Sequence, residues 1–129
     1  MDNDGWTALH RAAGNGSHTI VGQLLQAKAN IEAVDNNGWT ALHCAAASGH
    51  DTIVVQLLQA KANIEAVDND GYTALHLSAY NGKDTIVGQL LQAKANPTAV
   101  TKNGQTALQL AEQNGNQDVV QRLRQFHSP

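Results

Sequence analysis

Histidine is the residue type in this chain that most directly suggests chemistry, because six histidines occur among 129 residues. Three of them, His10, His43 and His76, recur at an interval of 33 residues, which could indicate a shared metal site. If each belongs to one copy of a repeated helical unit, neighbouring copies lie about 8–10 Å apart. Metal–nitrogen bonds to zinc are only about 2.0–2.1 Å long, so imidazoles spaced in this way cannot converge on one ion. The spacing therefore predicts no metal site and favours a structural role.

The cysteine and serine residues of the sequence do not indicate a catalytic nucleophile either. Cys44 is the one cysteine, which allows neither an intrachain disulfide nor a thiolate metal cluster. The serines lie in no nucleophile elbow, and neither a zinc-protease helix motif nor a phosphate-binding glycine loop is present. We expect Cys44 to act as a small apolar filler of the core. The sequence thus predicts no catalytic residues, no cofactor and no enzyme activity.

Composition limits the classes of partner. Hydrophobic residues make up 42% of the chain, charged residues make up 15%, and the formal net charge is −3, which fits a folded domain. Eight scattered Lys and Arg residues form no basic stripe, so no nucleic-acid partner is expected. No apolar run reaches the roughly 18 residues of a membrane span, and the N-terminus lacks the features of a signal peptide. We expect a cytoplasmic protein without membrane association, with a secreted effector or a part of a larger protein as alternatives.

A period of 33 residues organises the whole chain. Residues 2–34 and 35–67 are identical at 26 of 33 positions, and residues 68–100 match the second copy at 23 of 33. Residues 101–129 keep the frame but diverge and stop short. A fixed period of this size is typical of a stacked repeat array. We therefore expect a single domain, 1–129, with three full repeats and a truncated C-terminal capping repeat.

Each copy is expected to form two short helices. A threonine precedes an Ala-Leu pair as an N-cap does, and a glycine in left-handed backbone then ends the first helix. The threonines are Thr7, Thr40, Thr73 and Thr106, and the glycines are Gly16, Gly49, Gly82 and Gly115. The second helix carries one apolar face, and helices this short persist in water only when they stack. The sequence predicts an all-α solenoid of stacked helix-turn-helix units with β-hairpin loops.

The motifs of each copy resemble those of ankyrin repeats. They are Thr-Ala-Leu-His, the Ala-Ala that follows, Gly-His-Asp-Thr-Ile-Val, a Leu-Leu pair and Asp-Asn-Asn-Gly, and they cover essentially the whole chain. Alanine stands where that family usually has the proline of its Thr-Pro-Leu-His box, and lysine stands at positions 28, 61 and 94 where it usually has glycine. The resemblance implies that the three repeated histidines bond to the hairpin backbone. It also places the lysines in left-handed backbone.

The resemblance further implies a non-catalytic protein–protein interaction module. In that family the hairpin tips and the concave face of the first helices bind the partner, and in this chain many of these positions differ among the copies. The candidate partner-binding residues are Trp6, Trp39, Tyr72, Tyr80, Asp4, Asn37, Asp70, Ala47, Ser48 and Asn81. Aromatic residues are typical of interface hot spots. Alternatively, each tip ring packs on the next hairpin and stiffens the array.

Charge and the ends of the array leave further alternatives. Acidic residues border the first three copies and favour a partner with a basic rim, although they also fit solvated loop charge. They are Asp2, Asp4, Glu32, Asp35, Glu65, Asp68 and Asp70. We expect a monomer, with end-to-end self-association through the less polar first repeat as an alternative. A structural spacer of a larger multi-domain protein and an engineered repeat scaffold are the competing functions.

Overall fold

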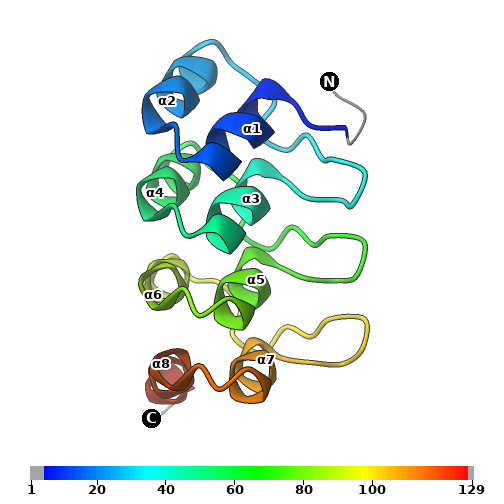
Figure 1. Cartoon of the computed structure of the whole chain (residues 1–129), viewed down its shortest axis with the longest axis vertical. Helices are drawn as coiled ribbons and strands as arrows, with labels where there is room; N and C mark the ends of the chain where they lie inside the picture. Colours follow the sequence, from blue (N-terminus) through cyan, green and yellow to red (C-terminus); the bar gives the residue numbers. More distant parts are fainter. Residues whose placement is uncertain (1–4, 128–129) are drawn as a thin grey trace.

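The computed structural model describes residues 5–127, which form eight α-helices in consecutive pairs. The first helices of the pairs are α1 (Ala8–Asn15), α3 (Ala41–Ser48), α5 (Ala74–Tyr80) and α7 (Ala107–Gln113). The second helices are α2 (His18–Gln26), α4 (Asp51–Gln59), α6 (Asp84–Gln92) and α8 (Gln117–His127). The first helices stack in one column and the second helices in another, with long loops that project from the first column (Figure 1). The predicted all-helical solenoid is confirmed.

The loops between the pairs are hairpin-shaped, but they contain no strand within residues 5–127. Two main-chain bonds close each tip. Before α3, the Asp35 N–H donates to the Trp39 carbonyl and the Gly38 N–H to the Asp35 carbonyl, both at 3.0 Å. Before α5, the Asp68 N–H donates to the Tyr72 carbonyl (2.9 Å) and the Gly71 N–H to the Asp68 carbonyl (3.0 Å). Neighbouring loops are also bonded to each other, because the Asn69 N–H donates to the Asn37 carbonyl (3.0 Å). The expected β-hairpins are thus turn-closed loops, tied edge to edge along the array.

The core is shared between neighbouring pairs rather than enclosed within each. Ile53 of α4 and Ile86 of α6 are only 1% and 2% exposed because the preceding pair covers them. Ile20, at the same position of α2, is 48% exposed. The short helices therefore depend on their neighbours for burial, as expected for a stacked array.

Three of the first helices, α1, α3 and α5, begin with a reciprocal cap between a threonine and a histidine. The Thr40 hydroxyl accepts the His43 N–H (3.3 Å), and the Thr40 N–H donates to His43 Nδ1 (3.0 Å). The same pairs form between Thr7 and His10 and between Thr73 and His76. A backbone N–H can only donate, so Nδ1 of each histidine is unprotonated and the proton lies on Nε2.

Two of the protonated Nε2 atoms link a copy to the next one. His10 donates to the Trp39 carbonyl (2.7 Å) and His43 to the Tyr72 carbonyl (2.9 Å), while His76 donates to the Ala99 carbonyl (3.0 Å) of its own copy. Burial lowers the pKa of His43 and His76, although these carbonyl bonds partly oppose the shift. The array therefore requires neutral histidines.

A lysine with left-handed backbone follows the end of each of the helices α2, α4 and α6: φ is 64° at Lys28, 71° at Lys61 and 76° at Lys94. At the first of these, the Lys28 N–H donates to the Leu25 carbonyl and the Ala29 N–H to the Leu24 carbonyl, both at 3.0 Å. This paired bonding is the Schellman motif, in which glycine is the favoured residue. The helix thus ends in the conformation that usually requires glycine, although the residue at this position carries a side chain.

We expect the triple replacement of Lys28, Lys61 and Lys94 by glycine to raise the free energy of unfolding. Left-handed backbone costs a non-glycine residue roughly 1–2 kcal/mol. The flexibility of glycine in the unfolded chain and the lost charge at the helix end offset part of this, leaving about 0.5 kcal/mol per site. Urea unfolding of the triple variant should show a higher midpoint at an unchanged slope. An unchanged or lower midpoint would show that the lysines are not strained.

Candidate functional site

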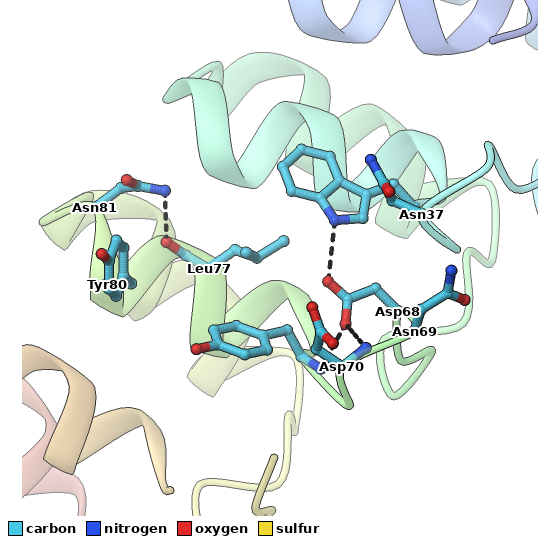
Figure 2. Close-up of a pocket in the computed structure, with 9 residues that line it drawn as sticks. Asn37, Asp68, Asn69, Asp70, Leu77, Tyr80 and Asn81 are labelled. Carbon is cyan, nitrogen blue, oxygen red and sulfur yellow. Dashed lines mark hydrogen bonds between the residues drawn. The ribbon is translucent and has the colours of Figure 1, made fainter. Parts of the chain in front are cut away.

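An open hollow of about 540 Å³ lies between two neighbouring loops and α5. Six of its lining residues were expected at a partner surface: Asn37, Trp39, Asp70, Tyr72, Tyr80 and Asn81. Asp68, Asn69 and Leu77 complete the lining. Figure 2 shows Leu77 and Tyr80 of α5, with Asn81 directly after the helix, at one side, and Asp68, Asn69 and Asp70 of the loop at the other. The structure therefore gathers residues from two copies into one surface.

The other four candidate residues lie elsewhere. Trp6 belongs to the tip of the first copy, where its ring is 3.5 Å from the place of a Cβ atom on Gly14. Ala47 is half-buried and Ser48 is exposed, and both lie at the end of α3 outside the lining of the hollow. Asp4 lies outside the described residues.

Asp68 lines the hollow, and the hydrogen bonds of its carboxylate hold the surrounding loops in place. Its Oδ1 atom accepts the N–H groups of Asp70 and Tyr72, each at 2.9 Å. Its Oδ2 atom accepts the indole N–H of Trp39 from the preceding copy at 3.0 Å. One carboxylate thus closes its own loop and fixes the neighbouring loop against it. Asp35 makes the same three kinds of bond one copy earlier.

Within the described residues, most carboxylates of the acidic edge also accept hydrogen bonds from the array itself. Glu32 accepts the Asn63 N–H and Glu65 accepts the Asn96 N–H, both at 2.8 Å, so each glutamate links two copies. Asp35 is buried. Asp70 differs because it is exposed and lines the hollow, whereas Glu32 and Glu65 are exposed but lie outside the lining. The edge is therefore largely structural, and Asp70 is its member best placed to meet a partner.

The tip tryptophans contribute to the array directly. Trp39 bonds to Asp68 of the next copy, and its ring stacks on His43 with centroids 6.3 Å apart and planes at 24°. Trp6 repeats the arrangement with Asp35 and His10. These contacts agree with the alternative that the tip rings stiffen the array, whether or not Trp39 also contacts a partner.

We expect Trp39→Ala to lower the free energy of unfolding by about 2 kcal/mol, roughly half the cost of truncating a fully buried tryptophan. Trp39→Tyr is the matched control, because Tyr72 occupies the same position in the next copy. It keeps an aromatic ring on His43 and should cost less than half as much. Chemical unfolding of both variants measures the difference. Equal losses would mean that the ring contributes nothing beyond the indole N–H bond.

Tyr72 reports the electrostatic character of the hollow. Burial raises its pKa first, and the neighbouring Tyr80, Asp68 and Asp70 raise it further. Negative charge near a phenol disfavours the phenolate, and the carboxylates of Asp68 and Asp70 bring such charge to the hollow. Tyr80 is 45% exposed, which leaves much of its ring available for contact.

Catalytic and metal chemistry gain no support from the described residues. No group of three or more His, Cys, Asp or Glu side chains within them could hold a metal ion. Cys44 is buried, and burial raises the pKa of its thiol to about 12, so the reactive thiolate is scarce near neutral pH. No helix in residues 5–127 is long and apolar enough to cross a membrane.

Sequence reasoning missed the residues that begin the second helices. His50 bonds through Nε2 to the Gly14 carbonyl (3.1 Å), and its ring lies where a Cβ atom on Gly16 would be 2.8 Å away. Asn116 donates to the carbonyls of Ala79 and Tyr80, each at 3.0 Å. These side chains bond to carbonyls at the end of the first helix of the previous copy, α1 for His50 and α5 for Asn116. Their types differ among the copies, so no sequence signal marked the shared role.

Two overlapping segments, residues 1–68 and 53–128, match the family model described as ankyrin repeats in three copies. Comparison with curated proteins gives no match. The family match spans nearly the whole chain and agrees with the stacked helix pairs, so the chain belongs to the ankyrin repeat family. Ankyrin repeats are generally non-catalytic protein–protein interaction modules.

Proposed function

We propose that this chain is a protein-binding module whose partner is anchored in the hollow between the loops and α5. The observation that carries the proposal is the convergence of Trp39, Tyr72 and Tyr80 on one open concavity. Large aromatic side chains in a concave, partly desolvated setting are typical of interface hot spots. The aromatic residues are few in this chain, at 4% of its length, so their gathering is informative.

Rigidity of the lining supports the proposal. The two loops are joined by the bond from the Asn69 N–H to the Asn37 carbonyl and by the bond from Trp39 to Asp68. Asn81 is held by the bond from its amide nitrogen to the Leu77 carbonyl (3.0 Å). A surface ordered before binding loses less conformational entropy when the partner arrives.

A structural spacer explains these residues less well. A spacer accounts for Trp39, which links two copies, but it gives no reason for the exposed ring of Tyr80. The chain itself places alanine at that position of the second copy, Ala47, and glycine at that of the first, Gly14. Tyrosine is therefore dispensable for the fold at this position, and binding gives it a role.

Selection from a random 12-residue peptide library displayed on phage tests the proposal. The full chain is the target, and the double variant Asp70→Asn, Tyr80→Ala is the comparison, because Asn37 and Ala47 are the chain's own residues at those positions. Selected peptides should bind the double variant at least about tenfold more weakly, a typical loss for hot-spot residues. Gln113→Ala, at the Tyr80 position of the fourth copy, is the control and should leave binding unchanged. Equal binding to wild type and double variant would place the binding surface elsewhere.

A further inference from the structure

We infer that the hollow recognises an arginine side chain of the partner, an inference that rests on the proposed function. Its lining combines aromatic faces from Trp39, Tyr72 and Tyr80 with the carboxylates of Asp68 and Asp70. None of the nine lining residues is a lysine, arginine or histidine, and Lys102 of the next loop, whose N–H donates to the Asp70 carbonyl (3.0 Å), lies outside the lining. A ligand that fits must bring positive charge together with a flat or apolar surface.

The two carboxylates have different parts in this recognition. Asp68 already accepts three N–H groups, all from neutral donors, so its charge remains in the hollow while its oxygens are occupied. Asp70 is exposed, and its own N–H is held by Asp68, which fixes the backbone that carries its carboxylate. Asn81 uses one N–H of its amide on the Leu77 carbonyl, which leaves its amide oxygen as a further acceptor beside one remaining N–H. The lining thus offers acceptors to a hydrogen-bond donor.

Arginine fits this set better than other charged groups. Its planar guanidinium stacks on aromatic faces and donates several hydrogen bonds in a fixed fork, as several acceptors beside flat rings require. Lysine brings a compact, strongly hydrated charge with less stacking surface. A carboxylate or phosphate would meet the negative charge of Asp68 and Asp70 without a compensating cation.

The combination is specific to this place along the described array. One copy earlier, Ala47 stands in place of Tyr80, and the tip residue in place of Asp70 is the neutral Asn37. One copy later, Lys102 replaces Asn69 and Gln113 replaces Tyr80. The neighbouring surfaces thus lack both the ring that corresponds to Tyr80 and the carboxylate that corresponds to Asp70.

The test is titration of the full, ¹⁵N-labelled chain with N-acetyl-arginine N-methylamide, followed by amide chemical shifts. N-acetyl-citrulline N-methylamide is the matched probe, because it keeps the shape of arginine and lacks the charge. Saturable shifts should be confined to the neighbourhood of residues 37–39, 68–72 and 77–81. The arginine probe should bind at least about fivefold more tightly than citrulline, the scale of a cation–π contact with a nearby carboxylate. Asp70→Asn should remove most of that preference, and Asp118→Asn on α8 should not.

Equal shifts from the two probes, or arginine shifts centred outside the hollow, would overturn the inference. The peptide selection separates this failure from that of the proposed function. Peptides that depend on Asp70 and Tyr80 but contain no arginine would leave the binding module intact and reject arginine recognition. Peptides that bind the double variant as well as the wild type would reject the module itself and the arginine site with it.

Discussion

Replacing His43 with alanine is expected to lower the free energy of unfolding by about 3–5 kcal/mol. The imidazole is 1% exposed, so its removal leaves a cavity. It also leaves the Thr40 N–H without its acceptor and the Tyr72 carbonyl with only the Asp68 N–H as donor. An unsatisfied buried group costs about 1–3 kcal/mol, which adds to the cost of the cavity and makes this one of the most damaging single changes in the array. Urea unfolding measures the loss.

His43→Gln is the control, because Gln109 takes this position in the fourth copy and its side-chain oxygen accepts the Thr106 N–H at 2.9 Å. This variant keeps the cap and should lose about half as much stability as His43→Ala. If alanine and glutamine cost the same, the cap contributes little and the cross-copy bond carries the effect.

The same histidines predict acid sensitivity. The pKa of His43 and of His76 is lowered in the folded chain from the ordinary value of 6.5, so between the two values the unfolded chain binds more protons. Stability from the neutral rings is thus complete above pH 6.5 and falls as the pH drops below it. The double variant His43→Gln, His76→Gln should flatten this dependence when unfolding is measured from pH 7 to pH 5. An equal slope in both proteins would assign the acid sensitivity to other groups.

The second large effect is expected at Gly38, which has φ of 80° and faces the next loop. A Cβ atom there would lie 2.6 Å from Asn69 Oδ1 and 2.9 Å from the Asn69 backbone nitrogen. That nitrogen makes the main-chain bond to Asn37, so relief of the clash disturbs a link between copies. We expect Gly38→Ala to cost about 2–3 kcal/mol, from left-handed strain and the weakened link.

Gly104→Ala separates the two contributions. Gly104 has φ of 78°, but nothing lies within 4 Å of the place of its Cβ atom. Only the backbone strain remains there, at roughly 1–2 kcal/mol. Thermal and urea unfolding of both variants give the difference. Equal losses at the two glycines would show that the edge-to-edge packing of the loops adds no stability.

Periodicity predicted the fold because its cause is local and repeated. Threonine before Ala-Leu sets a cap, glycine ends the helix, and the short apolar faces require stacking. Variation among copies was a weaker guide to the site, because it does not separate buried from exposed positions. Cys44, Leu77 and Leu110 share one variable position, and the structure leaves them only 1%, 8% and 1% exposed.

Contacts that cross between copies were harder to foresee. The double use of Asp68, as a cap of its own loop and as acceptor for Trp39, depends on where side chains 29 residues apart meet. The repeat pattern places both residues on loops but gives no distance between them. Tyr80 was identified because the resemblance placed its position on the concave face of the first helices and because aromatic residues are typical of interface hot spots.

Amide hydrogen exchange of the full chain, with and without a peptide selected on it, tests the central claim most directly. If the hollow anchors the partner, bound peptide should slow exchange in residues 69–72 and 77–82. Exchange in the second helices α4 and α8 should stay unchanged. Protection confined to the second helices, or to the exposed face around Ile20, would contradict the claim that the loops and α5 form the binding surface.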